Sequence, residues 1–179
     1  MIANILNAIT LSRIFCAILI YLILFLESNY SLALFLLFVA SFSDFLDGYL
    51  ARKTNSVSVL GEILDPIADK LLIVFVLIGL SINLNSFLIG FISSVIISRE
   101  IWVAALRDIN SRNNQSDKTR VTFLAKTKTA IQMLSILMYL FGLTINNMMI
   151  LFFADIILII ALLVTIQTGF QYTISTFKK

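Results

Sequence analysis

The 179-residue chain contains no histidine, one cysteine, one proline and few charged side chains. Because Cys16 has no second cysteine to pair with, an internal disulfide and a cysteine-rich metal site are both excluded. Without histidine, a general base must be a carboxylate, a lysine or a tyrosine, and a metal site must be built mainly from oxygen atoms. These absences narrow the chemistry that the chain can perform.

Charge is scarce, and apolar residues are abundant. Charged residues make up 13% of the chain and apolar residues 60%, whereas a soluble domain has about 25% and about 45–50%, respectively. This departure indicates that lipid is the solvent. A helix needs about 20 residues to cross a hydrocarbon layer of roughly 30 Å, so the chain has room for about six spans and for no separate soluble domain.

The pattern of apolar runs predicts an all-α integral membrane protein in which residues 1–179 form a single domain. Its six transmembrane helices are expected at residues 5–26, 30–52, 60–82, 86–108, 121–143 and 147–171. The first segment lacks the charged start and cleavage site of a secretory signal, so we expect it to be retained. Short polar stretches at 27–29, 83–85 and 144–147 suit tight turns between antiparallel helices.

Lysine and arginine are confined to one side of this topology. They lie in the N-terminal segment, in or beside the other two connections, and at the C-terminus, and none lies near the three short turns. The positive-inside rule therefore predicts that both termini and both basic connections face the cytoplasm. We expect a multi-pass protein of the cell (inner) membrane with its functional site on this face.

Four aspartates interrupt the second and third apolar segments: Asp44, Asp47, Asp65 and Asp69. A carboxylate inside a span is costly and is therefore a functional candidate by default, although a chance polar face between helices is the alternative. Helical spacing places each pair on one face, at similar depth. Facing carboxylates repel unless they are protonated or bind divalent cations, and an all-oxygen site suits Mg²⁺ or Mn²⁺. Two such ions can clamp a phosphoryl transfer.

Small residues alternate with these acids. Gly48, Ala51 and Gly61 would allow the helices, or a bulky substrate, to approach the backbone closely. Pro66 stands between two of the aspartates, where it can kink the helix and release a backbone carbonyl.

Together these residues form one spaced pattern, which resembles the signature of the CDP-alcohol phosphatidyltransferase family. The pattern is Asp44-x-x-Asp47-Gly48-x-x-Ala51-Arg52, then eight residues, then Gly61-x-x-x-Asp65-x-x-x-Asp69. The family's small six-helix architecture is also similar to the segmentation above. The resemblance implies a metal-dependent enzyme that transfers a phosphatidyl group from CDP-diacylglycerol to an alcohol and releases CMP.

The resemblance also implies roles for individual residues. Asp44, Asp47 and Asp65 would be metal ligands, and Asp69 would be both a ligand and the base that takes the proton of the attacking hydroxyl. The CDP-lipid would be received by Gly48, Ala51, Arg52, Ser58 and Gly61, with Asn7 and Thr10 near its head group. Independently, the planar guanidinium of Arg52 suits a pair of pyrophosphate oxygens.

Two further segments resemble the branch of this family that uses glycerol 3-phosphate as the acceptor. One carries Asn7, Thr10 and Arg13 on one side of the first helix; the other opens the fifth span with Lys126 and Lys128. The acceptor phosphate would be bound by Arg13, Arg99, Lys126 and Lys128. The branch usually has proline at Leu6 and glycine at Ala125, and neither departure changes a charge.

Several alternatives stay open at this point. The two lysines can anchor a helix end at the interface, Arg99 can pair with Glu100, and Arg13 can serve topology alone. Serine, inositol phosphate or phosphatidylglycerol can replace glycerol 3-phosphate as acceptor. An ion-coupled transporter and a non-enzymatic scaffold are further hypotheses, although the second half shows no counterpart of the aspartates. A homodimer is expected by resemblance, and no nucleic-acid partner is expected.

Overall fold

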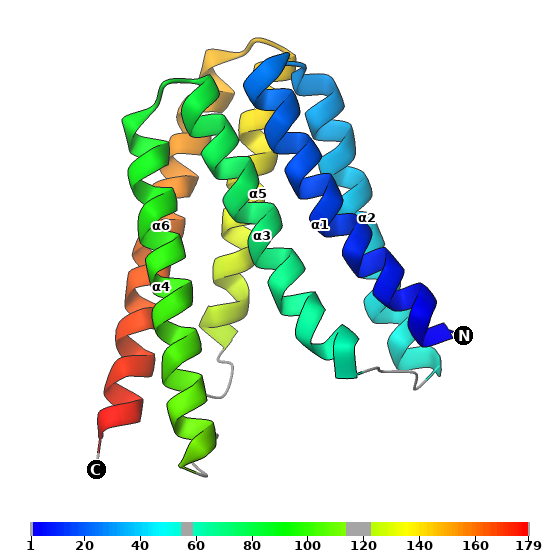
Figure 1. Ribbon diagram of the computed structural model, residues 1–179. Coiled ribbons are helices and arrows are strands. Elements are labelled where there is room, and N and C mark those ends of the chain that lie inside the picture. Colours follow the sequence, from blue (N-terminus) through cyan, green and yellow to red (C-terminus); the bar gives the residue numbers. More distant parts are fainter. Residues whose placement is uncertain (1, 55–58, 114–122, 179) are drawn as a thin grey trace.

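A computed structural model describes the backbone of residues 2–54, 59–113 and 123–178 and the side chains of residues 7–44, 61, 64–113 and 127–178. The described residues form six helices, as the apolar segments predicted (Figure 1). They are α1 (Ile2–Leu26), α2 (Tyr30–Thr54), α3 (Val59–Asn83), α4 (Phe87–Arg112), α5 (Phe123–Thr144) and α6 (Met148–Phe177). The protein is therefore all-helical in the part that the structure describes.

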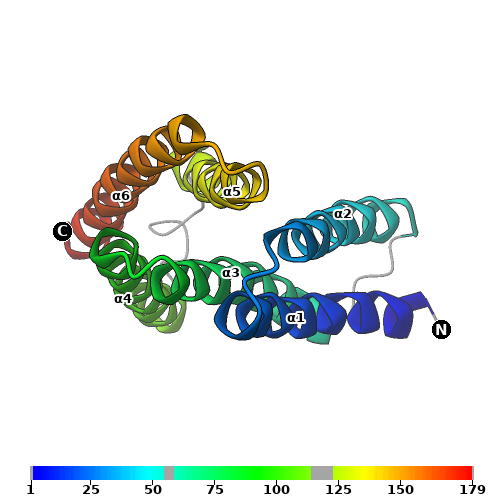
Figure 2. The same ribbon diagram turned by 90° about the horizontal axis from the view of Figure 1, so that it is seen from above.

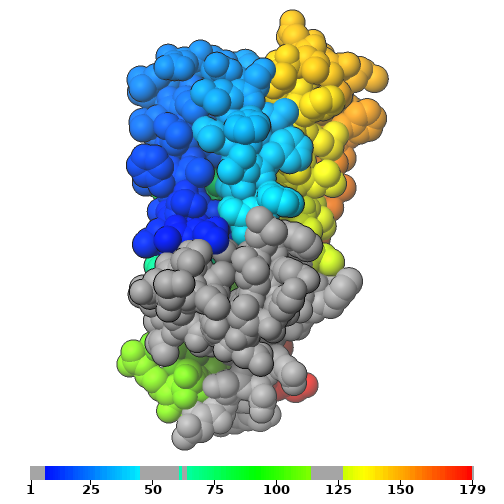
Figure 3. Space-filling model, turned by 90° about the vertical axis from the view of Figure 1, so that its right-hand side faces the viewer, coloured from blue at the N-terminus to red at the C-terminus, as the bar shows by residue number. Residues whose placement is uncertain are grey.

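The helices form a ring in the order α1, α3, α4, α6, α5, α2, in which each helix packs against its two neighbours. Figure 2 shows this ring from above, with α3 between α1 and α4 and α5 between α2 and α6. One further contact crosses the ring, between α3 and α5. The space-filling view shows α1, α2 and α5 in sequence across one face (Figure 3). Because α3 and α5 meet across the ring, residues from five helices can approach one site.

The three short turns all lie at one end of the ring, and each uses the same local device (Figure 1). Each contains a non-glycine residue with positive φ, namely Ser28, Asn85 or Asn146. The next residue, Asn29, Ser86 or Asn147, accepts a backbone N–H of the following helix with its side chain. Polar residues in these turns thus end one helix and start the next.

The opposite end carries the two termini and the helix ends that flank residues 55–58 and 114–122 (Figure 1). Here α4 and α6 continue past the ends expected from the sequence, residues 108 and 171, to Arg112 and Phe177. Val103 and Leu106 of α4 form a small cluster with Tyr172 of α6, and the Asn110 side-chain amide donates to Thr176 Oγ1 at 2.9 Å. These contacts between α4 and α6 support the parts of both helices that continue beyond the apolar segments.

The outside of the ring is apolar, which is the reverse of a soluble protein. Phe15, Phe35 and Phe170 are each more than half exposed, and so many large exposed apolar side chains require a lipid or protein cover. Among the described side chains, three segments are long and apolar enough to cross a membrane, and Tyr30–Asp44 is a shorter apolar stretch. The three are Asn7–Leu26, Phe87–Arg112 and Met148–Phe177. The protein is a membrane protein with several long apolar helices.

Candidate active site

Three helices bring the described aspartates of the motif around one arginine. Asp44 lies toward the end of α2, and Asp65 and Asp69 lie one turn apart on α3. Arg13 of α1 bonds to all three: its Nη1 contacts Asp44 Oδ1 and lies 2.8 Å from Asp69 Oδ1, while its Nη2 lies 3.3 Å from Asp65 Oδ1. Asp44 and the two aspartates of α3 therefore converge on Arg13, although α2 and α3 are not neighbours in the ring.

The N-terminal helix supplies a second polar contact to the same cluster. Thr10 lies almost one turn before Arg13 and donates its hydroxyl to Asp65 Oδ1 at 2.8 Å. Both side chains are buried. Asn7, which is partly exposed, precedes Thr10 by the same spacing. Thr10 and Arg13, on the side of α1 that the sequence singled out, thus face the aspartates of α2 and α3.

We call Arg13 with Asp44, Asp65 and Asp69 the carboxylate cluster. The Arg13 side chain is only 1% exposed, while the three carboxylates are 52%, 51% and 45% exposed. Three carboxylates and one guanidinium leave a net negative charge that faces an accessible space. Such a site attracts cations.

The donor chemistry of the carboxylate cluster suits a divalent metal ion. Its ligating atoms are carboxylate oxygens, which suit a hard cation such as Mg²⁺, and they already converge on one cationic group. Among the described side chains, no three acids form a ready-made metal cage, since the guanidinium of Arg13 stands between them. The residues fit a divalent ion that would compete with Arg13 for the same oxygens.

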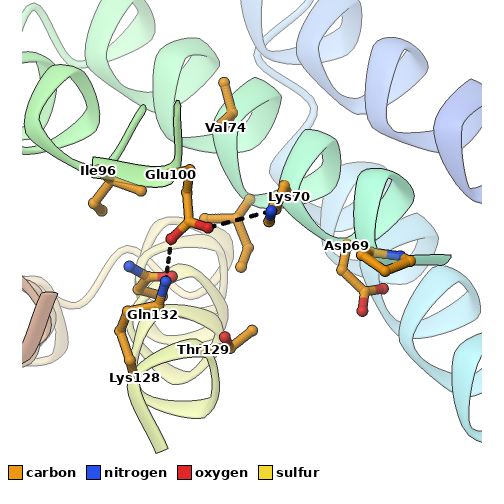
Figure 4. A pocket seen from close by; sticks show the side chains of 10 residues that line it. Asp69, Lys70, Val74, Ile96, Glu100, Lys128, Thr129 and Gln132 are labelled. Atoms are coloured by element: carbon orange, nitrogen blue, oxygen red, sulfur yellow. Dashed lines mark hydrogen bonds and ion pairs between the residues drawn. The ribbon is translucent and has the colours of Figure 1, made fainter. Parts of the chain in front are cut away.

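Two cavities adjoin Asp69. One, of about 240 Å³, is lined by Arg13, Asp44 and Asp69 and by Thr129 and Met133 of α5, among others. The other, of about 180 Å³, is lined by Asp69, by Lys70 and Glu100, and by Lys128, Thr129 and Gln132 of α5, with apolar neighbours (Figure 4). We call them the carboxylate cavity and the basic cavity. Asp69 and Thr129 line both, so a group in either cavity can reach the Asp69 carboxylate.

The basic cavity is organised around Glu100. Glu100 Oε1 accepts from Lys128 Nζ and from Arg99 Nη1, the latter at 2.9 Å. On the other side, Lys70 Nζ lies 3.5 Å from Glu100 Oε2 (Figure 4). Arg99 also donates to Thr168 Oγ1 of α6 at 3.0 Å. We call Glu100 with Lys70, Arg99 and Lys128 the basic cluster.

The structure therefore unites some predicted residues and separates others. Thr10 and Arg13 lie with the aspartates, whereas Lys128 and Arg99 lie in the neighbouring basic cluster. Gly61, partly buried, lies one turn before Asp65 on α3. The side chains of the remaining predicted residues lie outside the described part: Asp47, Gly48, Ala51, Arg52, Ser58 and Lys126.

Sequence reasoning missed Lys70 and saw Glu100 only as a partner for Arg99. Their signal was present, because each is a charged residue inside an apolar segment and such residues are functional candidates. Lys70 directly follows Asp69, and their side chains serve different clusters. Thr129 and Gln132, which line the basic cavity, were also not singled out.

One acid to which the sequence gave no role is accounted for by packing. Asp155 of α6 accepts a hydrogen bond from the hydroxyl of Tyr139 on α5. Tyr139 is buried in the apolar core, and neither residue lines the two cavities at Asp69. This pair links α5 to α6 and stands apart from the site.

Comparison with known proteins gives one family. The CDP-alcohol phosphatidyltransferase family matches residues 3–167. A CDP-diacylglycerol–glycerol-3-phosphate 3-phosphatidyltransferase from Rickettsia bellii is 38% identical over 172 residues, covering 94% of this chain and 93% of the relative. Proteins of the same name from Haemophilus influenzae (37% identity, covering 82% of this chain and 78% of the relative) and Escherichia coli (31%, covering 74% of each) are also similar. With the described aspartates of the motif gathered at one site, the chain belongs to the CDP-alcohol phosphatidyltransferase family.

Proposed function

We propose that this enzyme transfers the phosphatidyl group of CDP-diacylglycerol to glycerol 3-phosphate, giving phosphatidylglycerophosphate and CMP. The observation that carries the proposal is the basic cavity, which places Lys70 and Lys128 beside Asp69. An acceptor with a phosphate needs cations next to the base that activates its hydroxyl. Relatives that align with up to 94% of the chain carry the name of this activity.

The membrane arrangement follows from charge. All six helices would span the cell (inner) membrane, with both termini and the site toward the cytoplasm, where lysine and arginine accumulate. The termini lie at the same end of the ring (Figure 1), which this arrangement requires. A cytoplasmic site would give direct access to a water-soluble acceptor and let the lipid tails of CDP-diacylglycerol remain in the bilayer.

The proposed cofactor is Mg²⁺ or Mn²⁺, with two ions held by Asp44, Asp47, Asp65 and Asp69. When bound, the ions would neutralise charge on the phosphates of the CDP-lipid and on the departing CMP. The chain's own contribution is to hold the carboxylates together, and Arg13 and Thr10 do so from α1. Without such partners the carboxylates would repel one another.

Asp69 is the proposed base. Its carboxylate borders both cavities, so a CDP-lipid phosphate on one side and an acceptor hydroxyl on the other can meet there. Asp69 would take the proton of that hydroxyl as its oxygen attacks phosphorus. The CDP-lipid would be held by Gly48, Ala51, Arg52, Ser58 and Gly61, with Asn7 and Thr10 beside its head group.

The acceptor phosphate is assigned to Arg99, Lys126 and Lys128, with Arg13 as a further candidate. Lys128 lines the basic cavity directly, and Arg99 contacts the same Glu100 carboxylate. Arg13 lines the adjoining carboxylate cavity. Arg13 can reach a phosphate only when other cations neutralise Asp44, Asp65 and Asp69.

That the enzyme forms a homodimer remains a prediction.

The test is CMP release by detergent-purified protein supplied with CDP-diacylglycerol and Mg²⁺. Glycerol 3-phosphate, serine, inositol phosphate and phosphatidylglycerol would be offered separately as acceptors. We expect release with glycerol 3-phosphate alone and none after chelation of divalent ions. Release with another acceptor only would overturn the acceptor, and cation flux in liposomes without CDP-lipid, with no CMP release, would replace the enzyme by a transporter.

A further inference from the structure

We propose that Glu100 is a positioning residue that holds Lys70, Arg99 and Lys128 as one phosphate-binding unit beside Asp69. This inference rests on the proposed function, since it concerns how the phosphate of the acceptor is recognised. It adds Glu100 and Lys70 to the site and gives α6 a part in it.

The contacts show which member of the basic cluster organises the others, because Glu100 pairs with each of the three cations. The side chains of Lys128 and Arg99 are 6% and 9% exposed, and that of Glu100 is 14% exposed. Cations so close together and so shielded from water repel strongly, and one carboxylate between them compensates them. Lys70 approaches from the more exposed side, at 41%. Glu100 therefore fixes where each cation stands.

The charge of the cluster matches the proposed ligand. The basic cluster holds three cations and one carboxylate, an excess of two positive charges. Its members Lys70, Lys128 and Glu100 line the cavity beside Asp69. A phosphate monoester carries roughly two negative charges at neutral pH. Lys70 and Lys128 both line the cavity, so their ammonium groups can turn toward a phosphate without leaving the cluster (Figure 4).

Helix α6 supports the basic cluster through contacts with the side chain of Arg99. Thr168 accepts from Arg99 Nη2, and the Arg99 guanidinium carbon lies 5.6 Å from the centre of the Tyr172 ring. Gly169 lies under the same side chain, where an added Cβ would stand 3.2 Å from Arg99 Cγ. Gln132, which lines the basic cavity, donates to Thr165 of α6 at 3.1 Å. The contacts with Thr168, Gly169 and Tyr172 fix the Arg99 side chain in the position from which it donates to Glu100.

The experiment compares Glu100→Gln with the wild-type enzyme in the CMP-release assay, varying each substrate in turn. Without its charge the cations lose their common anchor, so we expect the KM for glycerol 3-phosphate to rise about tenfold or more. The KM for CDP-diacylglycerol should stay within about twofold, and kcat should fall less than the acceptor KM rises. Inorganic phosphate should compete with glycerol 3-phosphate more weakly in the variant.

Asp108→Asn is the matched control. It is an acid-to-amide change on the same helix, in an exposed pair with Arg112 at 2.8 Å, and should leave both KM values unchanged. Glu100→Asp keeps the charge and should give an intermediate acceptor KM. Thr168→Val removes the hydroxyl that accepts from Arg99 Nη2 and leaves Glu100 in place, so it tests the unit even if Glu100→Gln does not fold.

The outcomes separate this inference from the proposed function. Wild-type enzyme that uses glycerol 3-phosphate, together with an unchanged acceptor KM in Glu100→Gln, overturns the positioning role alone. Equal rises in both KM values do the same, because a general structural defect would produce them. Wild-type enzyme that uses only serine, which carries no phosphate, overturns the proposed function and the phosphate unit together.

Discussion

The carboxylate cluster and the basic cluster are near mirror images in charge. The first sets one arginine among three aspartates; the second sets one glutamate among two lysines and an arginine. In the first cluster the minority charge is nearly inaccessible: Arg13 is 1% exposed, and its partners are about half exposed. The exposed carboxylates of the first cluster attract cations, whereas the second cluster has an excess of positive charge, most accessible at Lys70, that favours an anion.

The charged side chains of the two clusters differ in how far they are exposed. All three carboxylates around Arg13 reach accessible space, whereas Arg99 and Lys128 are largely buried and only Lys70 is substantially exposed. An open site suits ions that arrive with their own water. A closed site suits a ligand that must exchange its water for fixed hydrogen bonds. Asp69 joins the two, because it belongs to the first cluster and lines the cavity of the second.

Removing the carboxylate of Asp69, which joins the two clusters, should have the largest effect on turnover. Asp69→Asn removes the proposed base while keeping the shape of the side chain, and a general base contributes about 10²- to 10⁴-fold to turnover. We expect CMP release to fall by at least this factor, and to background if the ions are lost as well. The protein should still insert into membranes and elute as a single species in detergent. Retained turnover would remove Asp69 from its role, and Asp108→Asn controls for the amide substitution.

Breaking the basic cluster at its most buried lysine should have the next largest effect. Lys128→Gln removes a cation that lines the basic cavity, and a hydrogen bond to a charged group is worth about 1.5–3 kcal/mol, or roughly 10- to 100-fold in the acceptor KM. Lys70→Gln should raise the same KM less, because its side chain is more exposed and lies 3.5 Å from Glu100. Steady-state kinetics with varied glycerol 3-phosphate measures both. Equal or reversed effects would contradict the ranking.

Replacing the arginine of the carboxylate cluster should show mainly as a loss of stability. Arg13→Gln leaves three aspartates without their cation, so in a chelator we expect about 1–2 kcal/mol lower stability, or a Tm lower by roughly 2–8 °C. Mg²⁺ should raise the Tm of the variant more than that of the wild type, because it supplies the missing positive charge. Thermal unfolding in detergent with and without Mg²⁺ measures this, and Arg112→Gln in an exposed pair is the control. An unchanged Tm in chelator would show that Arg13 does not stabilise the cluster.

The sequence predicted the carboxylate cluster far better than the basic one, for a physical reason. Asp65 and Asp69 share one face of α3, and the spacing of the motif places Asp44 at a similar depth on α2, so the sequence puts the three acids near one another. The place of Arg13 among them depends on the packing of α1 against both α2 and α3, which no local pattern specifies. The basic cluster draws on α3, α4 and α5, with a brace from α6. Only the order of helices around the ring brings these together, and that order is a tertiary property.

The Tyr139–Asp155 pair can be compared with the two clusters, because Asp155 is an acid in an apolar helix and belongs to neither of them. Its hydrogen bond joins α5 to α6, and neither residue lines a cavity at Asp69. Tyr139→Phe removes the donor and leaves the carboxylate without this partner, so we expect about 1 kcal/mol lower stability and unchanged kinetic constants for both substrates. Thermal unfolding and CMP release measured on one preparation decide it. A change in the acceptor KM would mean that an acid outside both clusters still influences the site. Unchanged kinetic constants with a lower Tm would show that Asp155 holds helices together and does not bind a ligand.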